Sequence, residues 1–332
     1  MGIQKLGVVG AGAWGTALAQ SMCYTSCDVM LWAHEKETAA EINEHNLNTT
    51  FLPEIPLNPK IQGTDDLEEL RNCDAVLLVA PAQFLRKISL DLKRILRPDC
   101  PVLICSKGIE IDSLKLMSQI LEETMPGSPL AILSGPSFAH EVAANLPAAL
   151  TLACSDEKLG LELINTLGHT TMRLYWTDDI IGAQIGGAIK NVMAIASGIS
   201  SGKDLGQNAH AALTTRGFVE LVEIGKAFGG RPETLTGLSG LGDLILTCSS
   251  PKSRNMSLGH ALGQGQTVQE ILGARKSVTE GVYTAEAIAK ISKTKDLELP
   301  ISNAVHQILQ GNLSVDLAID SLLSRPFKPE AH

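Results

Sequence analysis

Short apolar runs alternate with longer amphipathic stretches over the first half of the chain. The apolar runs are rich in β-branched residues and cover residues 6–9, 28–33, 75–80, 102–107, 130–135, 148–154 and 172–176. Stretches with helical periodicity lie between them at 84–96, 113–124 and 157–167. This alternation is typical of a sheet with helices wound on both faces. We therefore predict a doubly wound, Rossmann-like α/β domain over residues 1–178.

The pattern changes after Asp178, where the β-rich runs disappear. Helical periodicity covers residues 180–200, 209–228, 255–262, 268–272, 283–292, 301–309 and 315–323. We therefore predict an all-helical second domain over residues 179–332. The stretch 180–202 is apolar enough to resemble a membrane span, but Lys190 lies near its centre together with polar residues. The cost of inserting that lysine offsets the gain from the isoleucines, which favours a buried helix without membrane insertion.

A glycine-rich turn, Gly10-Ala-Gly12-Ala-Trp-Gly15, connects the first apolar run to a helical stretch. In such a turn the first glycine permits the tight bend, the second lets the backbone approach a pyrophosphate, and the third allows close packing of helix and strand. The following helix N-terminus then faces the phosphate charges with its free N–H groups. This arrangement predicts a dinucleotide-binding site.

The same stretch has a second interpretation as a secretory signal, because Lys5 and Ala17-Leu-Ala19 resemble its basic region and cleavage site. A single lysine and four glycines in the apolar core fit that template poorly. We therefore favour the phosphate-binding turn.

The second apolar run ends at His34, where a typical NAD site has an acidic residue for the ribose 2′-hydroxyl. Glu35 follows one position later. A histidine at this place suits a 2′-phosphate or the adenine, so both NADP and NAD stay open, with a lean toward NADP. The alternative is a surface histidine after a strand.

Composition narrows the functional classes. The 332 residues are 44% hydrophobic, and 27 basic against 36 acidic residues give a net charge of −9. No global positive field is available for nucleic acid, so an anionic substrate needs a locally positive pocket. The seven cysteines are odd in number and contain no C-x-x-C pair, which favours free thiols in a reducing, cytoplasmic environment and no structural metal site.

Candidate chemistry follows two of the predicted strands, as Ser106-Lys107-Gly108 and as Ser134-Gly135-Pro136-Ser137-Phe138-Ala139. Ligands of doubly wound folds sit at the carboxyl ends of strands, so both segments are placed to line a site. An ordinary solvated lysine and an ordinary Gly-Pro turn are the alternatives.

The helical half contributes further candidates. Lys190 and Asn191 share a helix face with small residues, which resembles a cavity wall more than a solvated face. Ser253 is an expected N-cap, and Arg254 with Asn255 at a helix start suits an anion, although a capped surface helix explains the same residues. Glu280 stands at another helix start, where a capping carboxylate is the simple interpretation.

Taken together, these segments resemble NAD(P)-dependent glycerol-3-phosphate dehydrogenases of the bacterial type. The motifs that carry the resemblance are Gly-Ala-Gly-Ala-Trp-Gly-Thr-Ala-Leu-Ala from residue 10, Ser-Lys-Gly at 106, Ser-Gly-Pro-Ser-Phe-Ala at 134, Lys-Asn at 190, Gly-Leu-Gly-Asp-Leu at 240, Ser-Arg-Asn at 253 and Glu-Gly at 280. They span nearly the whole chain in order. The resemblance implies interconversion of dihydroxyacetone phosphate and sn-glycerol 3-phosphate with NADP or NAD, which feeds phospholipid synthesis.

The resemblance also implies roles for individual residues. Lys190 corresponds to the proton-transfer residue. Besides Gly10, Gly12 and Gly15, the cofactor side would include Ala13, Trp14, His34, Lys107, Ala139, Arg254, Val278 and Glu280. The substrate side would include Lys107, Gly135, Ser137, Lys190, Asp243, Ser253, Arg254 and Asn255.

The expected chemistry agrees with these roles. Hydride delivery to a ketone builds negative charge on its oxygen, which a positioned ammonium stabilises and protonates. Burial lowers the pKa of Lys190, and a neighbouring carboxylate such as Asp243 raises it. Arg254 supplies charge for a phosphate.

Two other functions stay open: a related NAD(P)-dependent keto-acid reductase and a non-catalytic NAD(P) sensor. The reductase has no need of Ser253-Arg254-Asn255, and the sensor has no use for Lys190. The expected partner is a small phosphate-bearing molecule, and a homodimer is a reasonable expectation.

Overall fold

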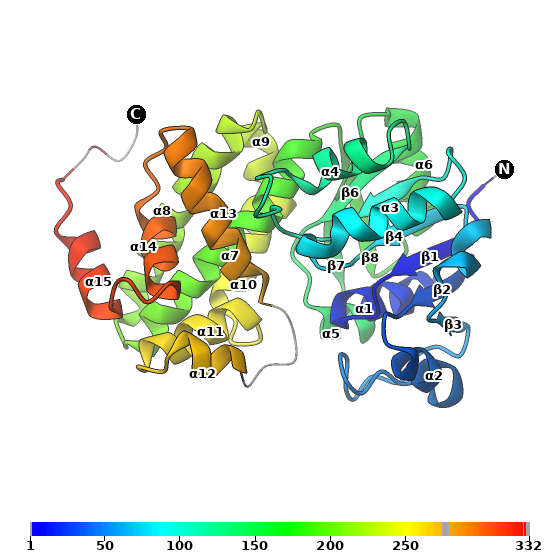
Figure 1. Cartoon of the computed structure of the whole chain (residues 1–332), viewed down its shortest axis with the longest axis horizontal. Coiled ribbons are helices and arrows are strands. Elements are labelled where there is room, and N and C mark those ends of the chain that lie inside the picture. Colours follow the sequence, from blue (N-terminus) through cyan, green and yellow to red (C-terminus); the bar gives the residue numbers. More distant parts are fainter. Residues whose placement is uncertain (1, 274–278, 328, 330–332) are drawn as a thin grey trace.

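The computed structural model describes residues 2–273, 279–327 and 329. A sheet flanked by helices occupies one half of the molecule, and a cluster of helices occupies the other (Figure 1). The predicted fold class is confirmed: an α/β, Rossmann-like half precedes a helical half.

One eight-stranded sheet contains every strand of the described residues, in the order β3-β2-β1-β4-β5-β6-β7-β8. The strands are β1 Lys5–Val9, β2 Asp28–Trp32, β3 Ile61–Thr64, β4 Ala75–Leu78, β5 Val102–Ile104, β6 Leu130–Ser134, β7 Ala148–Ala153 and β8 Met172–Thr177. Neighbours are parallel except β6 and β7, which pair antiparallel. The parallel strands β1 to β6 therefore present their carboxyl ends at one shared edge.

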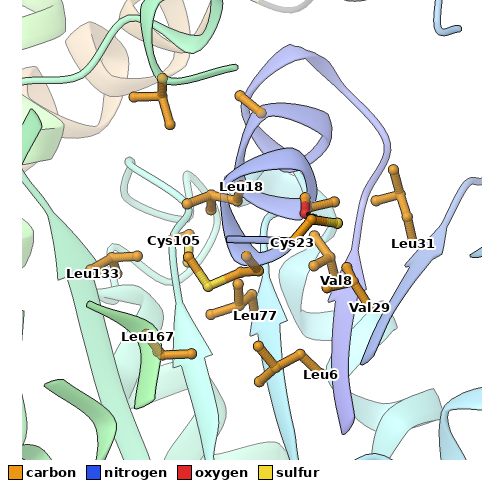
Figure 2. Packing of buried hydrophobic residues seen from close by; sticks show 14 of the residues in the cluster. Leu6, Val8, Leu18, Cys23, Val29, Leu31, Leu77, Cys105, Leu133 and Leu167 are labelled. Carbon is orange, nitrogen blue, oxygen red and sulfur yellow. Dashed lines mark hydrogen bonds between the residues drawn. The ribbon is translucent and has the colours of Figure 1, made fainter. Parts of the chain in front are cut away.

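Helices cover both faces of this sheet. They are α1 Ala13–Met22, α2 Lys36–His45, η1 Leu67–Asn72, η2 Ala82–Phe84, α3 Leu85–Ile95, α4 Met117–Thr124, α5 Ala139–Ala143 and α6 Glu157–Leu167. Alternate residues of one strand face opposite sides, so Leu77 joins the core beneath α1 whereas Leu78 joins the core beneath α3. Figure 2 shows the first of these cores, where Leu18 of α1 packs over Leu77 and Leu133.

The sequence-based boundaries need several corrections. β3 was not expected, because Gln62 and Gly63 interrupt its apolar run. The strand expected at 102–107 ends at Ile104, and the helix expected from residue 113 begins at Met117, because a turn and an isolated bridge between Ile109 and Leu116 occupy the segment between them.

The helical half is built around one long helix, α7 Ile180–Gly202. The others are α8 Gly206–Ala227, α9 Pro232–Leu235, η3 Leu238–Gly242, α10 Asp243–Ser249, α11 Arg254–Gly263, α12 Val268–Gly273, α13 Glu280–Thr294, α14 Pro300–Leu309 and α15 Val315–Leu323. η3 is a π-helical turn. α7 is the one described helix long and apolar enough to span a membrane, yet 89% of its most apolar 18-residue window is buried inside the protein.

All seven cysteines are free and buried. Burial in apolar surroundings raises the pKa of several of these thiols; that of Cys73, for example, rises to about 11. They act as small apolar core residues.

Candidate active site

Segments from both halves meet at the carboxyl-terminal edge of the sheet. Lys107 follows β5, and its Nζ donates a hydrogen bond to the carbonyl oxygen of Gly135, which follows β6, at 3.1 Å. Ser137 Oγ donates to the same carbonyl at 3.1 Å. On the other side of the edge lies α7, which packs on β6 and on η3. The two strand-end segments that the sequence indicated are therefore brought together.

Asp243 is the centre of a charged triad with Lys107 and Lys190. Its side chain is fully buried, and it is the first residue of α10. Lys190 Nζ donates to Asp243 Oδ1 at 2.5 Å, and Lys107 Nζ donates to Asp243 Oδ2 at 2.7 Å. Each lysine thus binds a different oxygen of one carboxylate. The expected neighbourhood of Lys190 and Asp243 is present, and Lys107 joins it.

The environment of Lys190 lowers the pKa of its ammonium group. Burial lowers the pKa of its ammonium group to about 8, the attraction of Asp243 opposes this change, and the repulsion of Lys107 adds to it. The ammonium also donates to Thr247 Oγ1 at 3.0 Å. A lysine with these properties can hold a proton at neutral pH and give it up to a nearby oxyanion.

The segment Ser253-Arg254-Asn255 lies at the start of α11, which packs against α7, the helix that carries Lys190. Ser253 caps the helix as predicted, accepting a hydrogen bond from the backbone N–H of Met256 at 3.2 Å. Asn255 Nδ2 donates to Asn191 Oδ1 at 3.0 Å, and Asn255 Oδ1 accepts from Gly281 N–H at 3.1 Å. The buried amide of Asn255 therefore joins α7, α11 and α13.

Arg254 and Glu280 form the second charged feature of this region. Arg254 keeps an exposed surface, yet crowding by the protein lowers the pKa of its guanidinium, an effect that the charge of Glu280 opposes. Glu280 does not cap its own helix, contrary to the simple interpretation. Its Oε1 instead accepts a hydrogen bond from the backbone N–H of Ala82 at 3.2 Å, which links α13 to the sheet half.

Burial raises the pKa of the Glu280 carboxyl to about 7, while the bond from Ala82 and the charge of Arg254 act to lower it. Its Oε2 is buried and has no hydrogen-bond partner among the described residues. A carboxyl that carries a proton near neutral pH and has one unpartnered oxygen can serve a bound ligand as donor or acceptor.

The glycine turn at the start of α1 has the shape a dinucleotide requires. Gly10 adopts φ 117°, which favours glycine, and a Cβ on Gly15 would meet the carbonyl oxygen of Gly10 at 1.8 Å. A Cβ on Gly12 would meet nothing within 4 Å, so open space lies in front of it. No described side chain caps the start of α1. These residues fit a pyrophosphate held by backbone N–H groups.

The other cofactor-side candidates lie around this turn. Ala13 and Trp14 form the first turn of α1, and Trp14 Nε1 is buried without a partner among the described residues. Ala139 begins α5, which packs against α1. His34 is exposed beyond β2, with its ring 6.0 Å from that of Trp32. Val278 lies outside the described residues.

Two participants escaped the sequence analysis. Thr247 accepts from Lys190 and donates to the Asp243 backbone carbonyl at 2.7 Å. Its position four residues after Asp243 on one helix is the signal that could have found it. The backbone N–H of Ala82 left no signal, since a backbone group is invisible in a residue pattern. Within the described part of the chain, no cluster of three or more His, Cys, Asp or Glu residues is placed to hold a metal ion.

Comparison with known proteins identifies the family. The model of the NAD-dependent glycerol-3-phosphate dehydrogenase N-terminus matches residues 5–160, and that of the C-terminus matches residues 179–320. The chain belongs to this dehydrogenase family. Similar curated proteins are named glycerol-3-phosphate dehydrogenase [NAD(P)+]: one from Caulobacter vibrioides is 53% identical over 100% of both chains, and one from Maricaulis maris is 51% identical over 98% of each.

A solved structure agrees with the family assignment. The glycerol-3-phosphate dehydrogenase of Coxiella burnetii shares 36% identity and a TM-score of 0.94 with this dehydrogenase-family chain, covering 97% of it and 99% of the Coxiella chain. The resemblance stated from the sequence motifs is therefore confirmed. NAD or NADP is the cofactor of the family.

A matched pair of glycine variants tests the phosphate turn. Gly15→Ala forces a carbon into the Gly10 carbonyl, so we expect a loss of stability of about 1–3 kcal/mol. Gly12→Ala meets only open space, so its melting temperature should stay unchanged while NADPH binding weakens about tenfold. Thermal unfolding and NADPH fluorescence titration measure both quantities. Unchanged NADPH affinity in Gly12→Ala would contradict the pyrophosphate position.

A second prediction concerns the Glu280 carboxyl. Its folded pKa, about 7, lies above the ordinary value of 4.5, so its contribution to stability is complete below pH 4.5 and is lost as pH rises through 7. Glu280→Gln keeps an oxygen for the Ala82 N–H but cannot titrate. We expect melting temperatures of wild type and variant to diverge by about 2–4 °C between pH 5 and pH 8. Exposed Glu122→Gln is the control, and parallel curves for wild type and Glu280→Gln would refute a raised pKa.

Proposed function

We propose that this protein interconverts dihydroxyacetone phosphate and sn-glycerol 3-phosphate by hydride transfer with NAD(P)H. The observation that carries the proposal is the buried triad of Lys107, Asp243 and Lys190 at the sheet edge, beside a phosphate-binding turn. The similar curated proteins carry this activity in their names. A keto-acid reductase or a non-catalytic sensor is not favoured by that family membership.

The residue roles form part of the proposal. Gly10, Gly12 and Gly15 with the start of α1 hold the pyrophosphate of the cofactor, which supplies the hydride when bound. Lys190 donates the proton to the ketone oxygen and takes it back in the reverse direction. Asp243 and Thr247 hold the ammonium group in place, supported by their contacts of 2.5 and 3.0 Å. Lys107 adds positive charge beside the oxyanion.

Phosphate recognition is assigned to the start of α11. Arg254, the N–H groups of that helix and the polar side chains of Ser253 and Asn255 supply charge and donors for a dianion. Ser137 and Gly135 are assigned to the substrate side because the Gly135 carbonyl accepts hydrogen bonds from both Lys107 and Ser137. Arg254 and Glu280 also line the cofactor side, as do Trp14, Ala139 and His34. The exposed residue after β2 is His34, where a typical NAD site has an acidic residue, so no carboxylate at this position repels a 2′-phosphate. This favours NADP as the cofactor.

Further proposals concern the metabolic role, the location and the domain division of the enzyme. The sn-glycerol 3-phosphate that it forms supplies phospholipid synthesis. Seven free, buried cysteines support a reducing, cytoplasmic location. The division into residues 1–178 and 179–332 is supported by the end of β8 at Thr177 and the start of α7 at Ile180, with a second apolar core around α7 that Ile109 and Leu116 of the first half also join. The homodimer stays a prediction.

Replacing the proposed acid gives the most direct test. Lys190→Met removes the ammonium group and keeps the length of the side chain, so ketone reduction should fall by about 100- to 10,000-fold. NADPH affinity should change little, since the glycine turn is elsewhere. Turnover followed by NADPH absorbance, with thermal unfolding as the folding control, checks this. Near-normal turnover in a stable variant would exclude Lys190 as the acid.

Arg254 should distinguish the phosphate substrate from the phosphate-free ketone. Arg254→Ala loses a charge-assisted contact, so kcat/KM for dihydroxyacetone phosphate should fall by about 10- to 100-fold. The weak reduction of dihydroxyacetone should change far less. NADPH affinity is measured in the same variant and turnover at saturating NADPH, because Arg254 also faces the cofactor side. Equal losses for both ketones would move the phosphate site toward Lys107 and Ser137.

A further inference from the structure

Two consecutive glycines, Gly186 and Gly187, precede Lys190 by one helical turn on α7. Both are buried in the middle of the helix. A glycine inside a helix costs about 1 kcal/mol relative to alanine, so a pair of them calls for a packing reason. Residues three and four positions apart share a helix face, which places the pair beside Lys190.

Gly186 lies against the backbone that leads into Asp243. A Cβ at this position would meet the carbonyl oxygen of Ser239 at 2.3 Å and the Cα of Gly240 at 2.7 Å. Ser239 and Gly240 belong to η3, and Asp243 follows η3 directly. The π-helical turn therefore touches the backbone of α7, and only glycine allows this approach.

Gly187 lies against the other arm of the triad. A Cβ here would meet Ser134 Oγ at 2.8 Å and both Cγ and Cδ of Lys107 at 3.3 Å. The alkyl stem of Lys107 thus passes over α7 at Gly187 before its Nζ reaches Asp243 Oδ2 at 2.7 Å. Any side chain at 187 would press on that stem.

We propose that the Gly186–Gly187 pair is the positioning element of the triad: Gly186 sets the place of Asp243, and Gly187 sets the place of Lys107, both relative to Lys190. The inference rests on the proposed function, in which Lys190 is the acid. Neither glycine touches the reacting atoms in this scheme. They act through the two charged side chains whose distances to Lys190 they fix.

The two glycines should act on Lys190 in opposite directions. The groups that face its ammonium are Asp243 and Thr247 of α10, the thiol of Cys248 and the ammonium of Lys107. Displacing Asp243 removes an attraction, which lowers the pKa of Lys190. Displacing Lys107 removes the repulsion between the two ammonium groups, and Asp243 then pairs with Lys190 only. Both changes raise the pKa of Lys190.

The experiment compares Gly186→Ala and Gly187→Ala with Gly202→Ala in the full-length protein. A Cβ on Gly202 would meet the carbonyl oxygen of His260 at 2.2 Å, so this control meets the same kind of backbone clash at the far end of α7. The pKa of Lys190 is read by NMR titration of lysine labelled with ¹³C and ¹⁵N, with the signal assigned by its loss in Lys190→Met. The pH profile of kcat is recorded alongside.

We expect shifts of about one pH unit, downward in Gly186→Ala and upward in Gly187→Ala, with none in Gly202→Ala. Shifts in the same direction, no shifts, or an equal shift in Gly202→Ala would overturn the proposal. If the NMR values move as expected while kcat does not follow, the positioning role stands and the assignment of Lys190 as the acid fails.

Gly186→Ala clashes with the backbone of Ser239 and Gly240, so this variant can fail to fold. A second test therefore uses Gly187 alone. The contacts of Gly187→Ala are with side chains, which can move. The double variant Gly187→Ala with Ser134→Ala removes the oxygen at 2.8 Å and leaves the contact with the Lys107 stem. It should keep the upward shift of the single variant. Return of the Lys190 pKa to its wild-type value would show that Lys107 is not what Gly187 positions.

Discussion

The carboxylate of Asp243 is the interaction on which the site depends. A fully buried charge is costly unless it is paired, and Asp243 is paired on both oxygens. Its partners also need it, since two ammonium groups this close would repel without the negative charge between them. Because Lys107 comes from the segment after β5 and Lys190 from α7, the same carboxylate joins the two halves of the molecule at the candidate active site.

The long helix α7 provides the frame for this arrangement. It packs on β6 from one side and on α8, α10, α11 and α13 from others, so it is surrounded by protein along most of its length. This burial accounts for the properties of the one lysine on the helix. The surrounding apolar side chains exclude water, which lowers the pKa of Lys190. The packed helix backbone also holds the Lys190 ammonium next to Asp243.

Local patterns were sufficient for much of the fold and for the identity of several site residues. The glycine turn has a fixed geometry, and Lys190 stood out as the single charge in an apolar stretch, so both could be predicted. The short β3, the antiparallel β7 and the π-helical η3 could not, because they depend on contacts between distant segments. The link from Ala82 to Glu280 is of the same kind, since 198 positions separate its two ends.

Burial acts on Lys190 and Glu280, two titratable groups of the candidate site, in a consistent way. It lowers the pKa of Lys190 to about 8 and raises that of Glu280 to about 7, so desolvation favours the neutral form of each. At neutral pH the carboxyl of Glu280 is only partly ionised, and the carboxylate of Asp243 is matched by two lysines. Arg254 then provides positive charge that Glu280 neutralises only when it ionises. Protonation of Glu280 therefore removes the negative charge that opposes that of Arg254, and Lys190, whose pKa is about 8, still holds its proton when Glu280 does.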